Sequence, residues 1–326
     1  MIQMAINAYA NTTMGSLPRN DDAYVILDIH EYVIIAVVDG NGGKEAMINT
    51  GAIATSVIRD YFQRTITPKT SIQEMESSIR NLMFLLSRVY LTVNAMNEQY
   101  VDINASLALA AIQKTSLSAC LCSIGSAEIE IIQNAQYRRL TQLYTEAYNL
   151  LDKGQIPPEE LYTHPKRAIL TSSLGVFDDF TYDIQRIRLL KDDILLLLTD
   201  GVYRVTTPGG VVETLGEAMQ EKNDIKYCVD KVLDKAYSYQ CDDNATLALI
   251  YIPDDNGATE VMKSEQKLHA PISSIRNQNM PSTPQGKNEI PRNNFFTPKS
   301  QVEQSRKSLF EDKNKTPIDE YNPYDL

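Results

Sequence analysis

The sequence predicts an α+β fold in which β-sheets pack on one another and helices cover their outer faces. Two runs of short apolar stretches, at residues 4–38 and 107–141, are typical of buried strands. Two blocks with apolar residues at helical spacing, at 44–96 and 216–237, are typical of amphipathic helices. Because such helices must bury their apolar faces against another layer, we expect them outside the sheets.

The composition favours an acidic cytoplasmic protein with a full hydrophobic core. The chain has 326 residues, of which 43% are hydrophobic, so one large domain or two can form. A net charge of −11 argues against nucleic acid or an anionic membrane as the main partner. The four cysteines show no disulfide framework, and neither a signal peptide nor an apolar run of ~20 residues is evident. We therefore expect a cytoplasmic location, the alternative being export by a route that the sequence does not show.

The N-terminal part alternates predicted strands with turn-rich loops. The strands are predicted at Met4–Tyr9, Ala23–Ile29 and Val33–Val38. The third strand stops at Asp39 and is followed by three glycines within four positions, which allow a sharp turn. A loop at residues 15–22 is rich in turn formers and adds the acidic pair Asp21 and Asp22.

Two helices are predicted after the glycines, from Lys44 to about Gln63 and from Ser71 onward. Ser71 is the expected N-cap, and Glu74 three residues later completes a capping box. A strand meander is predicted at 107–141 and a short helix within 142–175. Two strands follow at 183–190 and 194–199, then two helices at 216–219 and 224–237, and a last strand at 245–253.

Three aspartates lie where predicted strands end or begin. Asp39 and Asp200 each follow an apolar run and precede a glycine, and Asp243 lies just before the last strand. A role in turn formation explains any one of them, but not three in this setting. Because Mg²⁺ and Mn²⁺ prefer anionic oxygen ligands, the pattern predicts a metal site at the rim of a sheet.

The composition changes at Asp254 and predicts two regions, a folded domain at 1–253 and a disordered Pro/Asn-rich tail at 254–326. Seven of the 14 prolines follow this residue, and large apolar residues become sparse. Such a segment buries too little apolar area to offset its ordering entropy. Its apolar islands at 295–298 and 309–310 are either candidate sites for partner docking and phosphorylation or parts of a solvated tail.

Four motifs, in order and spacing, resemble those of the metal-dependent, protein phosphatase 2C-type (PPM) serine/threonine phosphatases. They are Asn20-Asp21-Asp22-Ala23, Val38-Asp39-Gly40-Asn41-Gly42-Gly43, Thr199-Asp200-Gly201-Val202 and Asp242-Asp243-Asn244-Ala245-Thr246. The likeness extends over about residues 4–253. Further stretches at 140–143, 153–156 and 164–175 are similar in particular to the bacterial branch of the family.

The resemblance implies an α-β-β-α sandwich of two antiparallel sheets, with two Mg²⁺ or Mn²⁺ ions at one edge. Carried over to this chain, Asp39 bridges both ions and the Gly40 carbonyl binds one of them. Asp200 and Asp243 hold the other ion, and Asp21, in place of the family's glutamate, acts through a metal-bound water. Two cations lower the pKa of a shared water and neutralise phosphoryl oxygens, so the catalytic group is water rather than a side chain.

Two other positions depart from the family pattern. Ser126 stands where an aspartate helps to hold a third metal, so the sequence does not support a third site. Leu17 stands where the resemblance implies a phosphate-binding arginine. Arg19, two residues before Asp21, is the candidate replacement, and a plain surface arginine is the alternative reading of it.

Two hypotheses therefore stand. The first is a metal-dependent hydrolase in signalling that removes phosphate from phosphoserine and phosphothreonine in a protein substrate. The second is a phosphatase-like regulatory or binding protein that recognises a partner without turnover. The core aspartates favour the first, because carboxylates packed together need a cation, whereas Ser126 and Leu17 favour the second.

Overall fold

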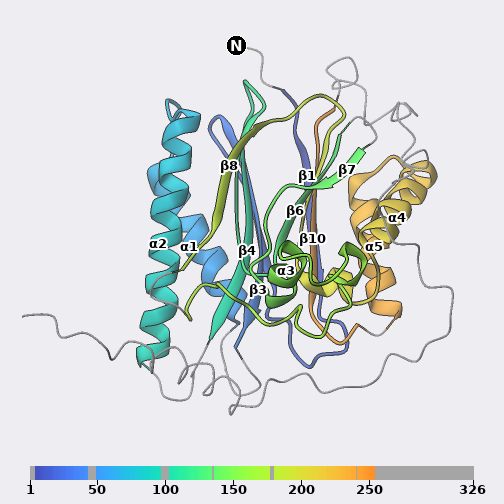
Figure 1. Cartoon of the computed structure of the whole chain (residues 1–326). Helices are drawn as coiled ribbons and strands as arrows, with labels where there is room; N and C mark the ends of the chain where they lie inside the picture. Colours follow the sequence, from blue (N-terminus) through green and yellow to red (C-terminus); the bar gives the residue numbers. More distant parts are fainter. Residues whose placement is uncertain are drawn as a thin grey trace, which may run out of the picture. The chain divides into compact units, whose positions relative to one another are not determined.

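Two five-stranded antiparallel sheets face each other in the described part of the chain (Figure 1). The structure is a computed structural model, and it describes residues 4–42, 49–96, 103–133, 136–176, 180–239 and 241–253. The strands are β1 (Asn7–Thr13), β2 (Ala23–Ile29), β3 (Tyr32–Asn41), β4 (Asn104–Gln113), β5 (Ser118–Ile124), β6 (Glu128–Gln133), β7 (Gln136–Arg139), β8 (Asp183–Arg188), β9 (Ile194–Leu198) and β10 (Ala245–Tyr251). One sheet has the order β1-β10-β9-β6-β7 and the other β2-β3-β4-β5-β8.

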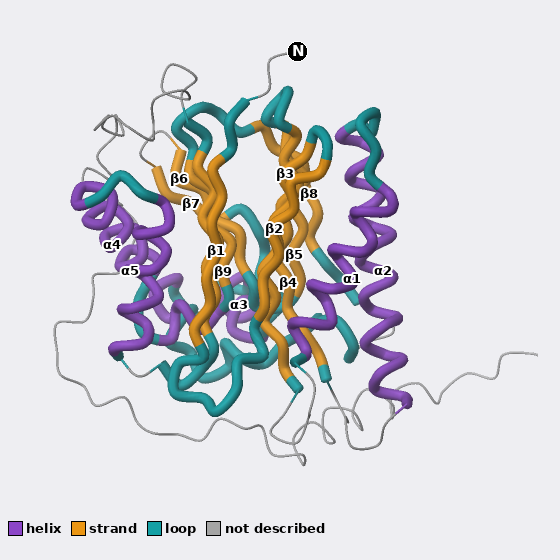
Figure 2. Tube along the Cα trace, turned by 180° about the vertical axis from the view of Figure 1, so that it is seen from behind, coloured by secondary structure: helices purple, strands orange, loops and turns teal. Residues whose placement is uncertain are grey.

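Two pairs of long helices cover the outer faces of the sheets, as Figures 1 and 2 show from opposite sides. The pair on the β3 sheet is α1 (Thr50–Thr65) and α2 (Ile72–Met96), and the pair on the β10 sheet is α4 (Pro208–Glu221) and α5 (Ile225–Ser238). Shorter helical segments are α3 (Glu146–Asp152), η2 (Pro158–Glu160) and η3 (Asp200–Arg204). The α-β-β-α sandwich expected from the sequence is thereby confirmed.

The central strands are apolar throughout because both of their faces are buried. Along β3, Ile34 packs with the α1 and α2 side chains, whereas Ile35 belongs to the core between the two sheets. On β9, Leu197 faces that same inner core and Leu196 packs with α4 and α5. Alternate residues therefore fill different layers, which explains runs without polar residues in an antiparallel sheet.

The capping box predicted at the start of α2 is confirmed. The Glu74 carboxylate accepts a hydrogen bond from the Ser71 amide at 2.7 Å, and the Glu74 amide donates to the Ser71 hydroxyl at 3.2 Å. These reciprocal bonds satisfy two backbone donors that the first turn of a helix leaves free.

Several predicted element boundaries are corrected. β1 begins at Asn7 rather than Met4 and continues to Thr13, because it pairs with β10 along its whole length. α1 begins at Thr50 rather than Lys44, with the Asn49 side chain accepting from the Ala52 amide at 2.7 Å; residues 43–48 lie outside the described part. β3 does not stop at Asp39 but remains paired with β4 through Asn41.

The predicted meander of residues 107–141 is wrong. β4 pairs with β5, but β6 leaves that sheet and lies between β9 and β7 in the other one. An apolar stretch indicates that a strand is buried but does not indicate which sheet contains it, so the crossing was not visible in the sequence.

The predicted domain boundary at residue 253 is also the last residue that the structure describes. The tail at 254–326, with its candidate docking segments, lies outside the described residues, so the division into two regions stays a prediction. Among the described helices, none combines the length and the apolar content that crossing a bilayer requires.

Candidate metal centre

Four segments that carry the predicted site residues meet at one edge of the sandwich. They are the β1–β2 loop with Asp21, the end of β3 with Asp39, η3 with Asp200, and the segment before β10 with Asp243. In Figure 2 this is the edge where loops gather, opposite the end marked N. The antiparallel pairing of β1 with β10 brings the β1–β2 loop beside Asp243.

Gly40 and Gly201, which follow two of the aspartates, let these segments approach closely. A Cβ atom on Gly40 would lie 2.4 Å from the Asp21 carbonyl oxygen, and one on Gly201 would lie 1.8 Å from the Asn244 carbonyl oxygen. No larger residue fits at either position without moving the neighbouring backbone. The glycine of each Asp-Gly pair therefore sets the distance between segments as well as forming the turn.

Asn244 holds the β1–β2 loop against the start of β10. Its Oδ1 accepts a hydrogen bond from the Asp21 amide at 2.8 Å, and its Nδ2 donates to the carbonyl oxygens of Met14 (3.1 Å) and Arg19 (2.9 Å). Asn244 is buried, so these bonds satisfy its amide group and fix the position of Asp21 relative to Asp243.

Asp22 is the most buried carboxylate at this edge, with 4% of its surface exposed. Its Oδ2 accepts hydrogen bonds from the hydroxyls of Thr199 (2.8 Å) and Thr246 (2.7 Å). Thr199 directly follows β9, and Thr246 is the second residue of β10. Burial raises the pKa of Asp22 to about 8; the two threonine bonds lower it, and the charges of Asp243 and Asp200 raise it. Asp22 therefore fastens the β1–β2 loop to both strands.

Asp39 lies opposite Ser106 of β4 and contacts Ser126. The Ser126 hydroxyl donates to the Asp39 carboxylate at 3.3 Å and lies 3.1 Å from the Ser106 hydroxyl. Ser126 thus supports the carboxylate as a hydrogen-bond donor, where an aspartate would add a further negative charge. Burial raises the pKa of Asp39 well above its ordinary value, and the nearby charges of Asp200, Asp22 and Asp243 add to that effect.

We call Asp22, Asp39, Asp200 and Asp243 the acidic cluster. One arginine enters it: the Arg204 guanidinium lies 2.7 Å from Asp243 Oδ2 and 3.9 Å from Asp200 Oδ2. Burial and the charge of Asp200 raise the pKa of Asp243 to about 6, although Arg204 acts to lower it. A second arginine lies at the rim, where Arg19 pairs with Asp21 at 2.5 Å.

The acidic cluster fits a divalent ion by the chemistry of its donors. Asp21 Oδ1 is buried and has no hydrogen-bond partner among the described residues, and burial together with the charges of neighbouring aspartates raises the pKa values of Asp39 and Asp243. A hard cation would relieve both conditions. In the described chain, however, no three Asp, Glu, His or Cys side chains are yet arranged to hold an ion. Binding therefore requires the carboxylates, and the arginine between two of them, to rearrange.

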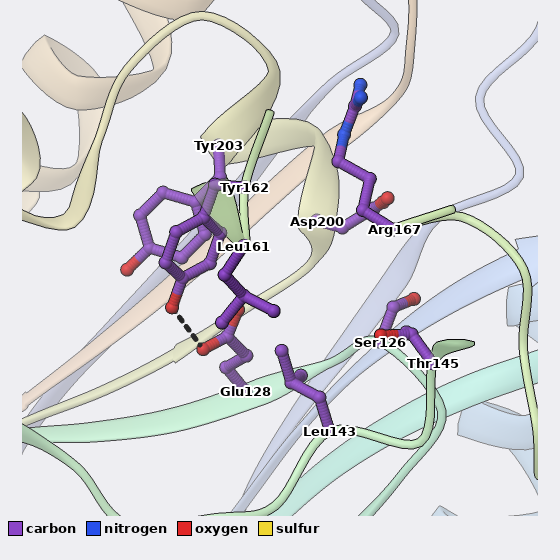
Figure 3. A pocket seen from close by; sticks show the side chains of 9 residues that line it. All are labelled: Ser126, Glu128, Leu143, Thr145, Leu161, Tyr162, Arg167, Asp200 and Tyr203. Atoms are coloured by element: carbon purple, nitrogen blue, oxygen red, sulfur yellow. Dashed lines mark hydrogen bonds between the residues drawn. The ribbon is translucent and has the colours of Figure 1, made fainter. Parts of the chain in front are cut away.

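A pocket lies beside the acidic cluster (Figure 3) and is lined by Ser126, Glu128, Leu143, Thr145, Leu161, Tyr162, Arg167, Asp200 and Tyr203. Arg167 and Asp200 lie at one side of it, and Glu128 and Tyr162 at the other. Arg167 is partly buried, and its side chain makes no hydrogen bond or ion pair with the other described residues. Burial and the like charge of Arg204 lower the pKa of Arg167, against the attraction of Asp200.

The far side of the pocket contains what we call the glutamate cluster, formed by Glu128, Glu130, Arg139, Tyr137, Tyr162 and Tyr203. Tyr162 donates to Glu128 at 3.0 Å, and Arg139 lies 3.5 Å from the same carboxylate. The hydroxyls of Tyr137 and Tyr203 both donate to Glu130. Two glutamates that are at most 1% exposed are thus provided with protein donors.

The structure brings the predicted residues Asp21, Asp39, Gly40, Asp200 and Asp243 to one edge and places Arg19 at its rim. Their roles as ligands and as a phosphate contact stay predictions. Sequence reasoning noted Asp22 and the stretch with Arg167 but assigned no role to Asp22, Arg204 or Arg167. Asp22 follows Asp21 directly, and Arg204 lies four residues after Asp200, the spacing at which helical side chains meet. Those two signals were available in the sequence.

The comparisons with known proteins identify bacterial phosphatases as similar. A family model described as Stage II sporulation protein E (SpoIIE) matches residues 150–253. The serine/threonine phosphatase Stp of Listeria monocytogenes serovar 1/2a is 28% identical over 220 residues, which cover 67% of this chain and 83% of that protein.

Solved structures share the fold. The S. agalactiae serine/threonine phosphatase matches with a TM-score of 0.67 at 20% identity, over 76% of this chain and all of that one (100%). The catalytic domain of the phosphatase PstP in complex with two manganese ions matches with a TM-score of 0.58 at 16% identity, over 76% of this chain and 99% of that one. At such identities these structures show the fold alone.

Proposed function

We propose that this chain, as a member of the metal-dependent, 2C-type serine/threonine protein phosphatases, removes phosphate from phosphoserine and phosphothreonine with two Mg²⁺ or Mn²⁺ ions. The convergence of Asp39, Asp200 and Asp243 at one sheet edge carries this proposal. The similarity to Stp over 83% of that protein supports the reaction, and the two manganese ions of PstP support the cofactor. The alternative of a binding protein without turnover gains no support from these relatives.

The proposed ligand set follows the positions at the edge. Asp39 would be shared by both ions, the Gly40 carbonyl would bind one, Asp200 and Asp243 would bind the other, and Asp21 would contribute through a water. When bound, the ions supply an activated water and neutralise phosphoryl oxygens. The chain's own contribution is to hold these oxygens in place, through Asn244 for Asp21 and through Ser126 for Asp39.

Arg19 is the proposed phosphate contact. Its guanidinium is held at the rim by Asp21, and 34% of its side chain is exposed, so part of it can meet a substrate. The acidic composition and the free cysteines support a cytoplasmic signalling role, and docking through the tail remains part of the proposal.

The test is hydrolysis of p-nitrophenyl phosphate and of a phosphothreonine peptide by the full chain in Mn²⁺, Mg²⁺ or EDTA. We expect turnover with Mn²⁺ or Mg²⁺, none in EDTA, and a loss of roughly 10²–10³-fold in Asp39→Asn, as for removal of a transition-state contact. Asp28→Asn is the matched control, since Asp28 is an exposed aspartate that pairs with Lys114.

Circular dichroism checks that both variants keep the fold. Full turnover in Asp39→Asn would refute the assignment of the site. An intact wild-type protein that binds Mn²⁺ but hydrolyses neither substrate would favour the phosphatase-like binding protein.

A further inference from the structure

Arg204 lies where the proposed function requires a metal ion. It ends η3, so its side chain returns over Asp200, the first residue of that segment, and reaches Asp243 at the start of β10. These are the two carboxylates assigned to the same ion. The guanidinium lies between the two Oδ2 atoms, so a divalent ion placed between those same atoms would compete with it for space and would be repelled by its charge.

The arginine is enclosed rather than lying on the surface. Only 15% of its side chain is exposed, and its Nε atom is buried without a hydrogen-bond partner among the described residues. An exposed ion pair contributes little to the free energy of unfolding. Removing one partner of a buried ion pair is strongly destabilising, because the other charge is then left buried without a partner. Burial acts to lower the pKa of Arg204, yet the charges of Asp200, Asp243 and Asp242 raise it above its ordinary value, so the side chain stays a cation.

We propose that Arg204 is a built-in counter-ion that occupies the cation position between Asp200 and Asp243 in the metal-free protein, so that a divalent ion binds there only by displacing it. The inference rests on the proposed function, from which the metal roles are taken.

The two metal positions then differ in affinity. The position at Asp39 and the Gly40 carbonyl does not include Arg204, whereas the position at Asp200 and Asp243 must first expel it. The ion at Asp200 and Asp243 therefore binds more weakly than the first ion. As the metal concentration rises, the position at Asp39 and Gly40 fills first, and the second position fills only at higher concentrations.

Isothermal titration of the full chain with Mn²⁺ tests this inference. For the wild type we expect one tighter and one weaker site. In Arg204→Met and Arg204→Gln, which lack the charge but differ in shape, the weaker site should tighten about tenfold, the effect of removing one charge-assisted contact. Arg204→Lys keeps a cation and should stay near the wild type.

Arg80→Met is the matched control, because Arg80 forms an exposed ion pair with Glu76 at the same four-residue spacing, on α2. Thermal unfolding in EDTA adds a second readout. The neutral Arg204 variants should melt at a lower temperature than the wild type and should gain more from Mn²⁺, since Asp200 and Asp243 lose their counter-ion.

Unchanged or weaker Mn²⁺ binding in the neutral variants would overturn the inference. So would native mass spectrometry showing that the wild type fills both positions at the same Mn²⁺ concentration, a measurement that requires no variant. Turnover of the same samples separates the two proposals: tighter binding without hydrolysis refutes the phosphatase but not the displacement. Hydrolysis with unchanged affinity refutes only the displacement.

Discussion

The acidic cluster and the glutamate cluster are two sets of buried carboxylates on either side of one pocket (Figure 3), and they are stabilised in opposite ways. In the glutamate cluster, tyrosine hydroxyls and Arg139 surround the two carboxylates. In the acidic cluster, burial and neighbouring aspartates raise the pKa values of Asp22, Asp39 and Asp243, and the Arg204 guanidinium lies between two of the carboxylates.

The difference indicates which cluster is structural and which is a binding site. In the glutamate cluster, tyrosine hydroxyls donate to both carboxylates, although Glu130 Oε2 is buried without a partner among the described residues, and these donors help to keep the glutamates buried without a metal ion. Carboxylates that face one another destabilise the fold until a cation arrives, and such local strain is common at functional sites. The acidic cluster should therefore respond to metal as well as to pH, whereas the glutamate cluster should respond to pH alone.

The largest expected effect is the loss of metal-dependent stability in Asp243→Asn. At a Mn²⁺ concentration 100 times the dissociation constant, the wild type should gain about 2.7 kcal/mol of unfolding free energy. Asp243→Asn removes one carboxylate ligand and should gain less than about 1 kcal/mol. Urea unfolding with and without Mn²⁺ measures both values.

Glu128→Gln is the control from the other cluster and should keep the full gain from Mn²⁺. If both variants lost the gain equally, the two clusters would be one coupled site. If neither lost it, Asp243 would not be a ligand.

The next effect concerns pH. Burial raises the pKa of Glu128 to about 8; Arg139 acts against this shift, and the charge of Glu130 adds to it. Between the ordinary value of 4.5 and about 8, the folded protein keeps a proton that the unfolded chain releases. Unfolding therefore releases this proton. The stabilisation that the bound proton gives the folded state is fully present at low pH and is lost as the pH rises through that range.

Glu128→Gln cannot release that proton. Its unfolding free energy relative to the wild type should therefore rise by ~2 kcal/mol between about pH 5 and about pH 6.5. Urea unfolding in EDTA, at several pH values, isolates this effect from metal binding. A constant difference between the two proteins across the range would mean that Glu128 is ionised in the folded state throughout.

The sequence predicted the layers of the fold and the aspartates of the site, because both depend on local patterns. Apolar runs such as Val33–Val38 mark buried strands, and an aspartate beside a glycine marks a turn at their ends. The crossing of β6 into the other sheet was not predictable, since it depends on pairing with β9. Pairing partners are chosen by packing over the whole domain.

The contacts within the site were predictable only in part. The motif containing Asp200 extends to Arg204 at helical spacing, but whether that arginine turns inward depends on Asp243, which is 39 residues away. Arg167 gave no such signal, because its environment is assembled from the Asp200 segment and from Arg204. Long-range electrostatics therefore accounts for most of what the motifs left undetermined.

Arg167 lies beside Asp200, on the acidic-cluster side of the pocket, and gives the smallest effect. Because its guanidinium makes no hydrogen bond or ion pair with the other described residues, Arg167→Ala should leave the unfolding free energy within about 0.5 kcal/mol of the wild type. A partly buried cation beside Asp200 can still attract a phosphorylated peptide, so KM should rise about threefold to tenfold with little change in kcat.

Lys166→Ala, which removes a surface pair with Glu146 at 2.9 Å, is the control and should leave KM unchanged. An unchanged KM in Arg167→Ala would leave Arg19 as the one arginine proposed to contact phosphate, whereas a fall in kcat alone would indicate that Arg167 acts on the acidic cluster rather than on the substrate.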